Sequence, residues 1–166
     1  MKKQLLFVFA FFVSFGFSQS PNQKIQSYIN ENYKKLNISP SEVSNWVIET
    51  ETSSETTGIT NYLVMQTYNN IKIDNSYIYF WIKNGEVINS PEGFISNVAS
   101  KVNIGSPALG VVDGFSSALL KLNENNFASS ILSSDKNKFK LSNGALTDDA
   151  VNAELVYFPN QNGDLI

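Results

Sequence analysis

The sequence predicts an α+β fold of two small lobes, each a helix packed on an antiparallel β-sheet. Three observations support this class. Apolar residues at helical spacing follow the N-terminal segment, two alternating apolar runs then end in turn signals, and the same helix-then-hairpin order recurs in the second half of the chain. The 166 residues suffice for one medium domain or two small ones.

Two apolar runs predict the central part of the first sheet. Residues 59–68 end at Asn69-Asn70, and residues 76–83 end at Asn84-Gly85. Asn-Gly favours a type I′ turn, because that turn needs positive φ at both central residues. Asn-Asn is a weaker form of the same signal, since Asn tolerates the left-handed region. We therefore expect an antiparallel meander over residues 58–90.

The strand predicted over residues 76–83 has two different faces, because successive side chains alternate across a strand. One face carries Tyr77, Tyr79 and Trp81, and the other carries Ile78, Phe80 and Ile82. We expect the second group to face a helix. The aromatic group suits either a covering layer of this chain or a docking surface for a partner, and both interpretations stay open.

Helical spacing predicts one helix at the start of each lobe. Ser20-Pro21 predicts the start of the first helix, over about residues 21–36, with a capping hydroxyl and Pro at the first helical position. Its apolar stripe is Ile25, Tyr28, Ile29 and Leu36. The second helix is predicted over about residues 108–122. Its expected buried face is Val111, Val112, Phe115, Ala118, Leu119 and Leu122.

Further strands complete each lobe. Residues 46–50 predict a first strand that precedes a polar turn at 52–58, and Asn143-Gly144 predicts another hairpin. Residues 151–158 predict one strand with Val151, Ala153, Leu155 and Tyr157 on one side. After the turn at 159–164 only two residues remain. We therefore expect the 151–158 strand to lack a return partner, and the chain to be the front part of a longer precursor.

Composition excludes several kinds of chemistry. The chain has no His and no Cys, so it offers no His general base, no thiol nucleophile, no disulfide and no zinc site built from these residues. The acidic residues do not form an evident catalytic pair. The net charge is −3, and all twelve basic residues are Lys. We expect neither enzymatic activity nor nucleic-acid binding from this chain, since it has no basic patch.

The N-terminus predicts an export signal. Lys2 and Lys3 precede an apolar run over residues 5–17, which is too short for a comfortable membrane span and contains six Phe. Small residues precede the expected signal-peptide cleavage site, and the last of them is Ser18, which predicts cleavage between Ser18 and Gln19. We expect a mature chain of net charge −5 in the periplasm or outside the cell, without a stable membrane anchor.

Three stretches of the mature chain resemble the pro-region of fungalysin-type zinc metalloproteases. They are SPSEVSNWVIETETSSETTGITNYLVMQTYNNIKIDNS, WIKNGEVINSPEGFISNVASKV and NAELVYFPNQNGDLI. The matching motif residues are Thr57, Gly58, Ile59, Thr60, Gln66, Tyr68, Asn69, Ile71, Asn84 and Gly85. The resemblance implies an FTP-type propeptide lobe over residues 19–103 and a second, PepSY-like lobe over 104–166, incomplete at its C-terminus, after a signal peptide at 1–18.

The chain departs from the family pattern at two motif positions. The family often has His where this chain has Asn61, and Gly where it has Asn70. Asn70 can still adopt the left-handed turn conformation. A larger departure is that family members continue into a catalytic domain whose His-Glu-x-x-His motif holds zinc, and this chain contains no such motif.

The resemblance implies a non-catalytic chaperone and inhibitor of a metalloprotease catalytic domain, acting in cis or in trans. Zinc would then belong to that domain, and this chain would carry no cofactor. We expect Tyr77, Tyr79 and Trp81 to form the partner interface. The alternative is a free-standing secreted or envelope module for binding or inhibition, with no attached protease.

Overall fold

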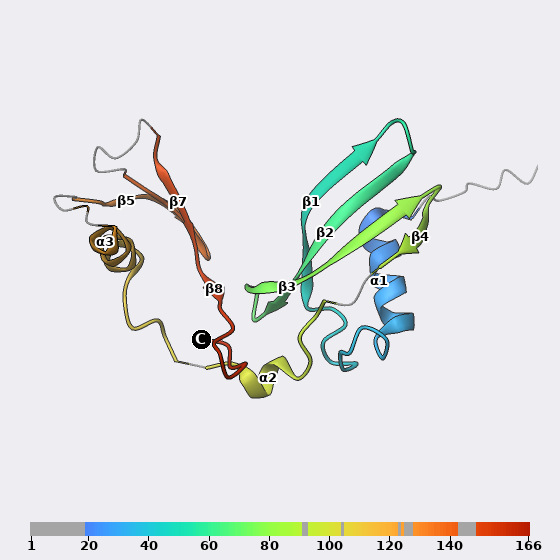
Figure 1. Cartoon of the computed structure of the whole chain (residues 1–166), viewed down its shortest axis with the longest axis horizontal. Helices are drawn as coiled ribbons and strands as arrows, with labels where there is room; N and C mark the ends of the chain where they lie inside the picture. The colour runs from blue at the N-terminus through green and yellow to red at the C-terminus, as the bar shows by residue number, and fades with distance from the viewer. Residues whose placement is uncertain (1–18, 91–92, 104, 123, 125–127, 143–148) are drawn as a thin grey trace, which may run out of the picture.

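The computed structural model describes residues 19–90, 93–103, 105–122, 124, 128–142 and 149–166, and the structural statements below concern this part of the chain. The fold is α+β, as predicted, with two sheets (Figure 1). The larger sheet has the order β1-β2-β3-β4, and β8 joins it beside β3. The smaller sheet has the order β5-β6-β7.

Helix α1 (Pro21–Asn32) begins where the sequence predicts. Ser20 is the N-cap: its Oγ accepts a hydrogen bond from the Gln23 backbone N–H at 3.3 Å, and Gln23 Oε1 accepts one from the Ser20 N–H at 2.9 Å. This reciprocal pair is a capping box. The helix ends at Asn32, before the predicted end, but the following turns still place Leu36 fully in the core.

The predicted meander is confirmed. Strands β1 (Trp46–Ser54), β2 (Ile59–Tyr68), β3 (Ile71–Lys83) and β4 (Glu86–Asn89) pair antiparallel in sequence order. Both turns have positive φ at their two central residues, 49° and 62° at Asn69-Asn70, and 50° and 84° at Asn84-Gly85. The prediction was too short for β1, which runs to Ser54, and for β3, which starts directly after the Asn-Asn turn.

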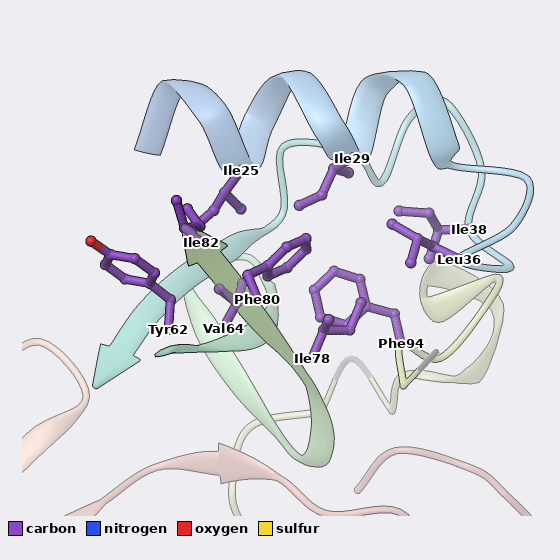
Figure 2. Close-up of a cluster of buried hydrophobic side chains, with 10 residues drawn as sticks. All are labelled: Ile25, Ile29, Leu36, Ile38, Tyr62, Val64, Ile78, Phe80, Ile82 and Phe94. Carbon is purple, nitrogen blue, oxygen red and sulfur yellow. The ribbon is translucent and has the colours of Figure 1, made fainter. Parts of the chain in front are cut away.

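Helix α1 covers one face of the larger sheet, as expected from its apolar stripe (Figure 2). Ile25 and Ile29 of α1 meet Ile78, Phe80 and Ile82 of β3, and all five are buried. The other buried members of this cluster are Leu36, Ile38, Tyr62, Val64 and Phe94. At about 25 cal/mol for each Å² of apolar surface removed from water, this core is the main stabilising contribution to the first lobe.

Two buried polar side chains attach the segment after β4 to the sheet. Gln66 Oε1 accepts a hydrogen bond from the Ile95 N–H at 2.8 Å and one from the Ser76 hydroxyl, and Gln66 Nε2 donates to the Ile95 carbonyl at 2.9 Å. Glu42 accepts from the Val98 N–H at 2.8 Å, at the start of the short helix α2 (Val98–Lys101). Gln66, one of the motif residues, thus has a structural role here.

The smaller sheet consists of β5 (Ile131–Asp135), β6 (Lys138–Leu141) and β7 (Val151–Glu154), with α3 (Val111–Lys121) beside it (Figure 1). The predicted buried face of α3 is wrong at two positions. Ala118 and Leu122 are exposed, Leu122 by 70%, because the sheet is too small to cover the whole apolar side of the helix. Leu119 is buried, while Val111, Val112 and Phe115 are half-buried. The hairpin expected at Asn143-Gly144 lies outside the described residues.

The single strand predicted over residues 151–158 is wrong, because the chain changes sheets at Leu155. β7 pairs antiparallel with β6, whereas β8 (Val156–Tyr157) pairs parallel with β3 of the larger sheet. The expected lack of a return partner is also wrong. The Phe158 N–H and carbonyl bond with the Ile166 backbone at 2.9 and 3.1 Å, and Leu165 is fully buried beside Val102. The chain therefore ends next to α2 (Figure 1).

Candidate partner interface

Tyr77, Tyr79 and Trp81, which we call the aromatic face, lie on the side of β3 opposite α1. Their exposed fractions are 40%, 38% and 39%, so the described part of the chain does not cover them. The Tyr77 and Tyr79 rings stack edge to face, with centroids 5.6 Å apart and planes at 76°. Edge-to-face contact is one of the arrangements that pairs of aromatic rings prefer.

The residues beside the aromatic face extend it across the sheet without adding charge. On β2, Met65 pairs opposite Tyr77, Leu63 opposite Tyr79 and Asn61 opposite Trp81. Directly opposed residues in an antiparallel pair share a face. The same rule places Val47, Thr50 and Thr52 of β1 in the next row. None of these nine side chains is ionisable except through the two phenols.

The aromatic face has a packed core directly behind it. Its three residues alternate along β3 with Ile78, Phe80 and Ile82, which are exposed by 8% or less. The Phe80 ring also meets Tyr28 of α1 edge to face at 5.6 Å. A surface on such a strand is preformed, so a partner would not have to pay much of the entropy of ordering it.

Asn61, at which the sequence departs from the resembled pattern, lies beside the aromatic face. It stands where the resembling family often has His, and the structure places it opposite Trp81. Its Oδ1 is covered and has no hydrogen-bond partner among the described residues. The departure from the pattern therefore falls on the candidate interface and not in the core.

A second feature of the site region is an ion-pair cluster between the two sheets. The Lys72 ammonium on β3 contacts Glu49 of β1 and Glu154 of β7, the latter at 3.0 Å, and the Lys72 side chain is only 12% exposed. Burial lowers the pKa of Lys72, but the hydrogen bonds and charges of the two carboxylates outweigh that effect and leave it above its usual 10.5. Asn137 adds a hydrogen bond to the Asn70 carbonyl at 2.9 Å.

No pattern in the sequence indicates this cluster or the buried Glu42. Glu49 and Glu154 occupy alternating, polar positions that are typical of solvated strand faces, and 82 residues separate Lys72 from Glu154. Only the switch of the chain from β7 to β8 brings these residues together. Glu42 lies in a polar turn, and nothing local shows that α2 will begin beside its carboxylate.

Three further observations concern metal ligands, membrane-spanning helices and the predicted cleavage site. Among the described residues no three acidic side chains gather as ligands for a metal ion, and the chain contains no His or Cys. In that part of the chain no helix is long and apolar enough to cross a bilayer. The predicted cleavage site is described only in part: Ser18 lies outside the described residues, and Gln19 is exposed just before α1.

The structure thus brings the three predicted interface residues together as one exposed surface and leaves their partner to be identified. No protein-family model and no curated protein matches this chain.

Proposed function

We propose that this chain is the non-catalytic pro-region of a secreted zinc metalloprotease, which helps the catalytic domain to fold and inhibits it until the two are separated. The observation that carries the proposal is the aromatic face: Tyr77, Tyr79 and Trp81 are each about 40% exposed, and the β2 and β1 residues in the rows opposite them carry no charge. Tyr and Trp are the residue types that dominate binding energy at protein interfaces.

Inhibition of a catalytic domain makes few physical demands on this chain. An inhibitor that covers a catalytic cleft needs a preformed surface and slow dissociation, and it needs no reactive group of its own. The core behind β3 supplies the rigid support, and the aromatic residues supply apolar area with polar tips that can hydrogen-bond. In this proposal zinc belongs to the catalytic domain, and no residue of this chain is assigned to bind it.

An inhibition assay tests the proposal. Purified residues 19–166 are mixed with a fungalysin-type catalytic domain, and cleavage of a peptide substrate is followed. We expect inhibition that saturates with increasing concentration of the chain. Undiminished cleavage at high micromolar concentrations of the folded chain would contradict the proposal. A thermal unfolding curve of the same sample checks that the chain is folded.

The alternative, a free-standing module, uses the same face for a partner that is encoded elsewhere. The coding sequence downstream of Ile166 separates the two hypotheses. An in-frame continuation that contains His-Glu-x-x-His supports action in cis. A stop codon directly after Ile166 and no matching catalytic domain supports the free-standing module.

A further inference from the structure

We propose that Gln19 is a modification site and that the exported chain begins with pyroglutamate. The proposal rests on the predicted cleavage between Ser18 and Gln19. It does not depend on a protease partner, so its failure and the failure of the proposed function are distinguishable.

The chemistry needs only the first residue of the mature chain. Cleavage gives Gln19 a free α-amine next to its own side-chain carboxamide. The amine nitrogen attacks Cδ and forms a carbon–nitrogen bond that closes a five-membered lactam. The bond from Cδ to the side-chain nitrogen breaks, and that nitrogen leaves as ammonia with a proton from the attacking amine. No oxidant, metal or second substrate is consumed.

Gln19 directly precedes the N-cap of α1, and the structure holds the residues that follow it. Gln19 is exposed, and no described interaction involves its side chain. The next residue, Ser20, is fixed by both hydrogen bonds of the capping box, at 3.3 and 2.9 Å. Pro21 then starts α1. The ring can therefore close without disturbing the helix, since the reaction leaves the peptide bond to Ser20 intact.

Electrostatics favours the cyclised form. The N-terminus of a helix carries a partial positive charge, and α1 has no acidic residue in its first turn to offset a nearby cation. A charged α-ammonium on Gln19 would lie just before this end. The lactam is neutral, so its formation removes an unfavourable interaction from the helix that supplies Ile25 and Ile29 to the core.

Mass spectrometry and N-terminal sequencing test the proposal on protein isolated from the cells that encode it. We expect the N-terminal peptide that begins at residue 19 to weigh one ammonia less than its sequence requires, and no signal in Edman sequencing until pyroglutamyl aminopeptidase removes the first residue. The variant Gln19→Asn is the matched control. Asn would need a strained four-membered ring, so this variant should keep its full mass and a readable N-terminus.

A free Gln19 in the isolated protein would overturn the proposal, and so would a mature N-terminus at another residue. A second measurement addresses the electrostatic argument. We expect purified residues 19–166 to show a higher Tm after treatment with glutaminyl cyclase than before, and Gln19→Asn to show no change. An equal or lower Tm of the cyclised chain would contradict the stabilisation of α1.

Discussion

At the scale of single residues, Phe80 is central to the first lobe, because it is fully buried between α1 and the sheet and meets Tyr28 edge to face. We predict that Phe80→Ala lowers the free energy of unfolding by about 3–5 kcal/mol. The control Phe158→Ala removes a ring that is 52% exposed and should change it by about 0.5 kcal/mol or less. Urea denaturation measures both, and equal effects would contradict the assigned core.

Glu42 provides a pH-dependent contribution to stability. Burial raises its pKa, but hydrogen bonds from Ser39 and from the Val98 N–H outweigh that effect and lower the pKa below the ordinary 4.5. A carboxyl whose pKa is lower in the folded state stabilises the fold above its unfolded pKa, and this contribution is lost as the pH falls through the folded pKa.

The expected outcome is a difference between wild type and Glu42→Gln that depends on pH. At pH 7 the variant should be less stable, because a neutral amide accepts fewer and weaker hydrogen bonds. The difference should shrink as the pH falls from about 4.5, where Glu42 of the unfolded chain takes up a proton, through the lower pKa at which Glu42 of the folded chain does so. Denaturation curves at several pH values measure it, and a difference that stays constant with pH would show that the pKa of Glu42 is not lowered in the folded state.

At the scale of elements, the segment after β4 packs closely on β3. A Cβ added to Gly93 would lie 2.0 Å from the Tyr77 carbonyl oxygen, so no side chain fits there without movement of the backbone. We predict that Gly93→Ala destabilises the first lobe by about 1–3 kcal/mol, as overpacking does elsewhere. Thermal unfolding checks this.

The control for that variant is Gly114→Ala in α3, where nothing lies within 4 Å of the added Cβ. Because Ala favours a helix interior over Gly, we expect this change to be neutral or stabilising by up to about 1 kcal/mol. If Gly93→Ala were also neutral, Gly93 would not lie as close to the Tyr77 carbonyl oxygen of β3 as the structure places it.

Local signals predicted most of the first lobe. The Asn-Asn and Asn-Gly turns, the cap at Ser20 and the alternation along β3 each depend on neighbouring residues, and the structure confirms them. The predictions that were wrong concern contacts between residues far apart in the sequence. Periodicity shows an apolar side of α3 but cannot show how much sheet is available to cover it, and Leu122 stays exposed.

The aromatic face could also be predicted, because it depends on neighbouring residues of one strand. Alternation along one strand identified Tyr77, Tyr79 and Trp81 as a group, but whether another layer covers them depends on the rest of the chain. The split of residues 151–158 between two sheets was not predictable, because one apolar run satisfies the pattern of either sheet. The Lys72 cluster depends on that split, so no local signal could indicate it.

At the scale of the whole molecule, Lys72 helps to join the two sheets through Glu49 and Glu154. Removing the cation would leave two carboxylates near each other without compensation. We predict that Lys72→Met loosens β8 on β3, so that backbone amides at Val156 and Tyr157 exchange with solvent faster, while β2 is unaffected. Hydrogen exchange measures this.

Lys83→Met is the matched control for that experiment. Lys83 is an exposed Lys on the same strand, and no described ion pair involves it. Its replacement should leave exchange at β8 unchanged. Equal exchange in the wild type and Lys72→Met would show that the parallel pairing of β8 with β3 holds the sheets together without the ion pairs.

The most direct test of the docking role is the affinity of residues 19–166 for a fungalysin-type catalytic domain, measured by titration calorimetry with and without the aromatic face. If Trp81 and Tyr79 are central interface residues, each Ala substitution should cost about 2 kcal/mol or more, or roughly 30-fold in Kd. Phe158→Ala, which removes an exposed ring outside this face, should bind like the wild type. Binding that is equally tight in all of these folded variants would contradict the assignment of Tyr77, Tyr79 and Trp81 as the partner interface.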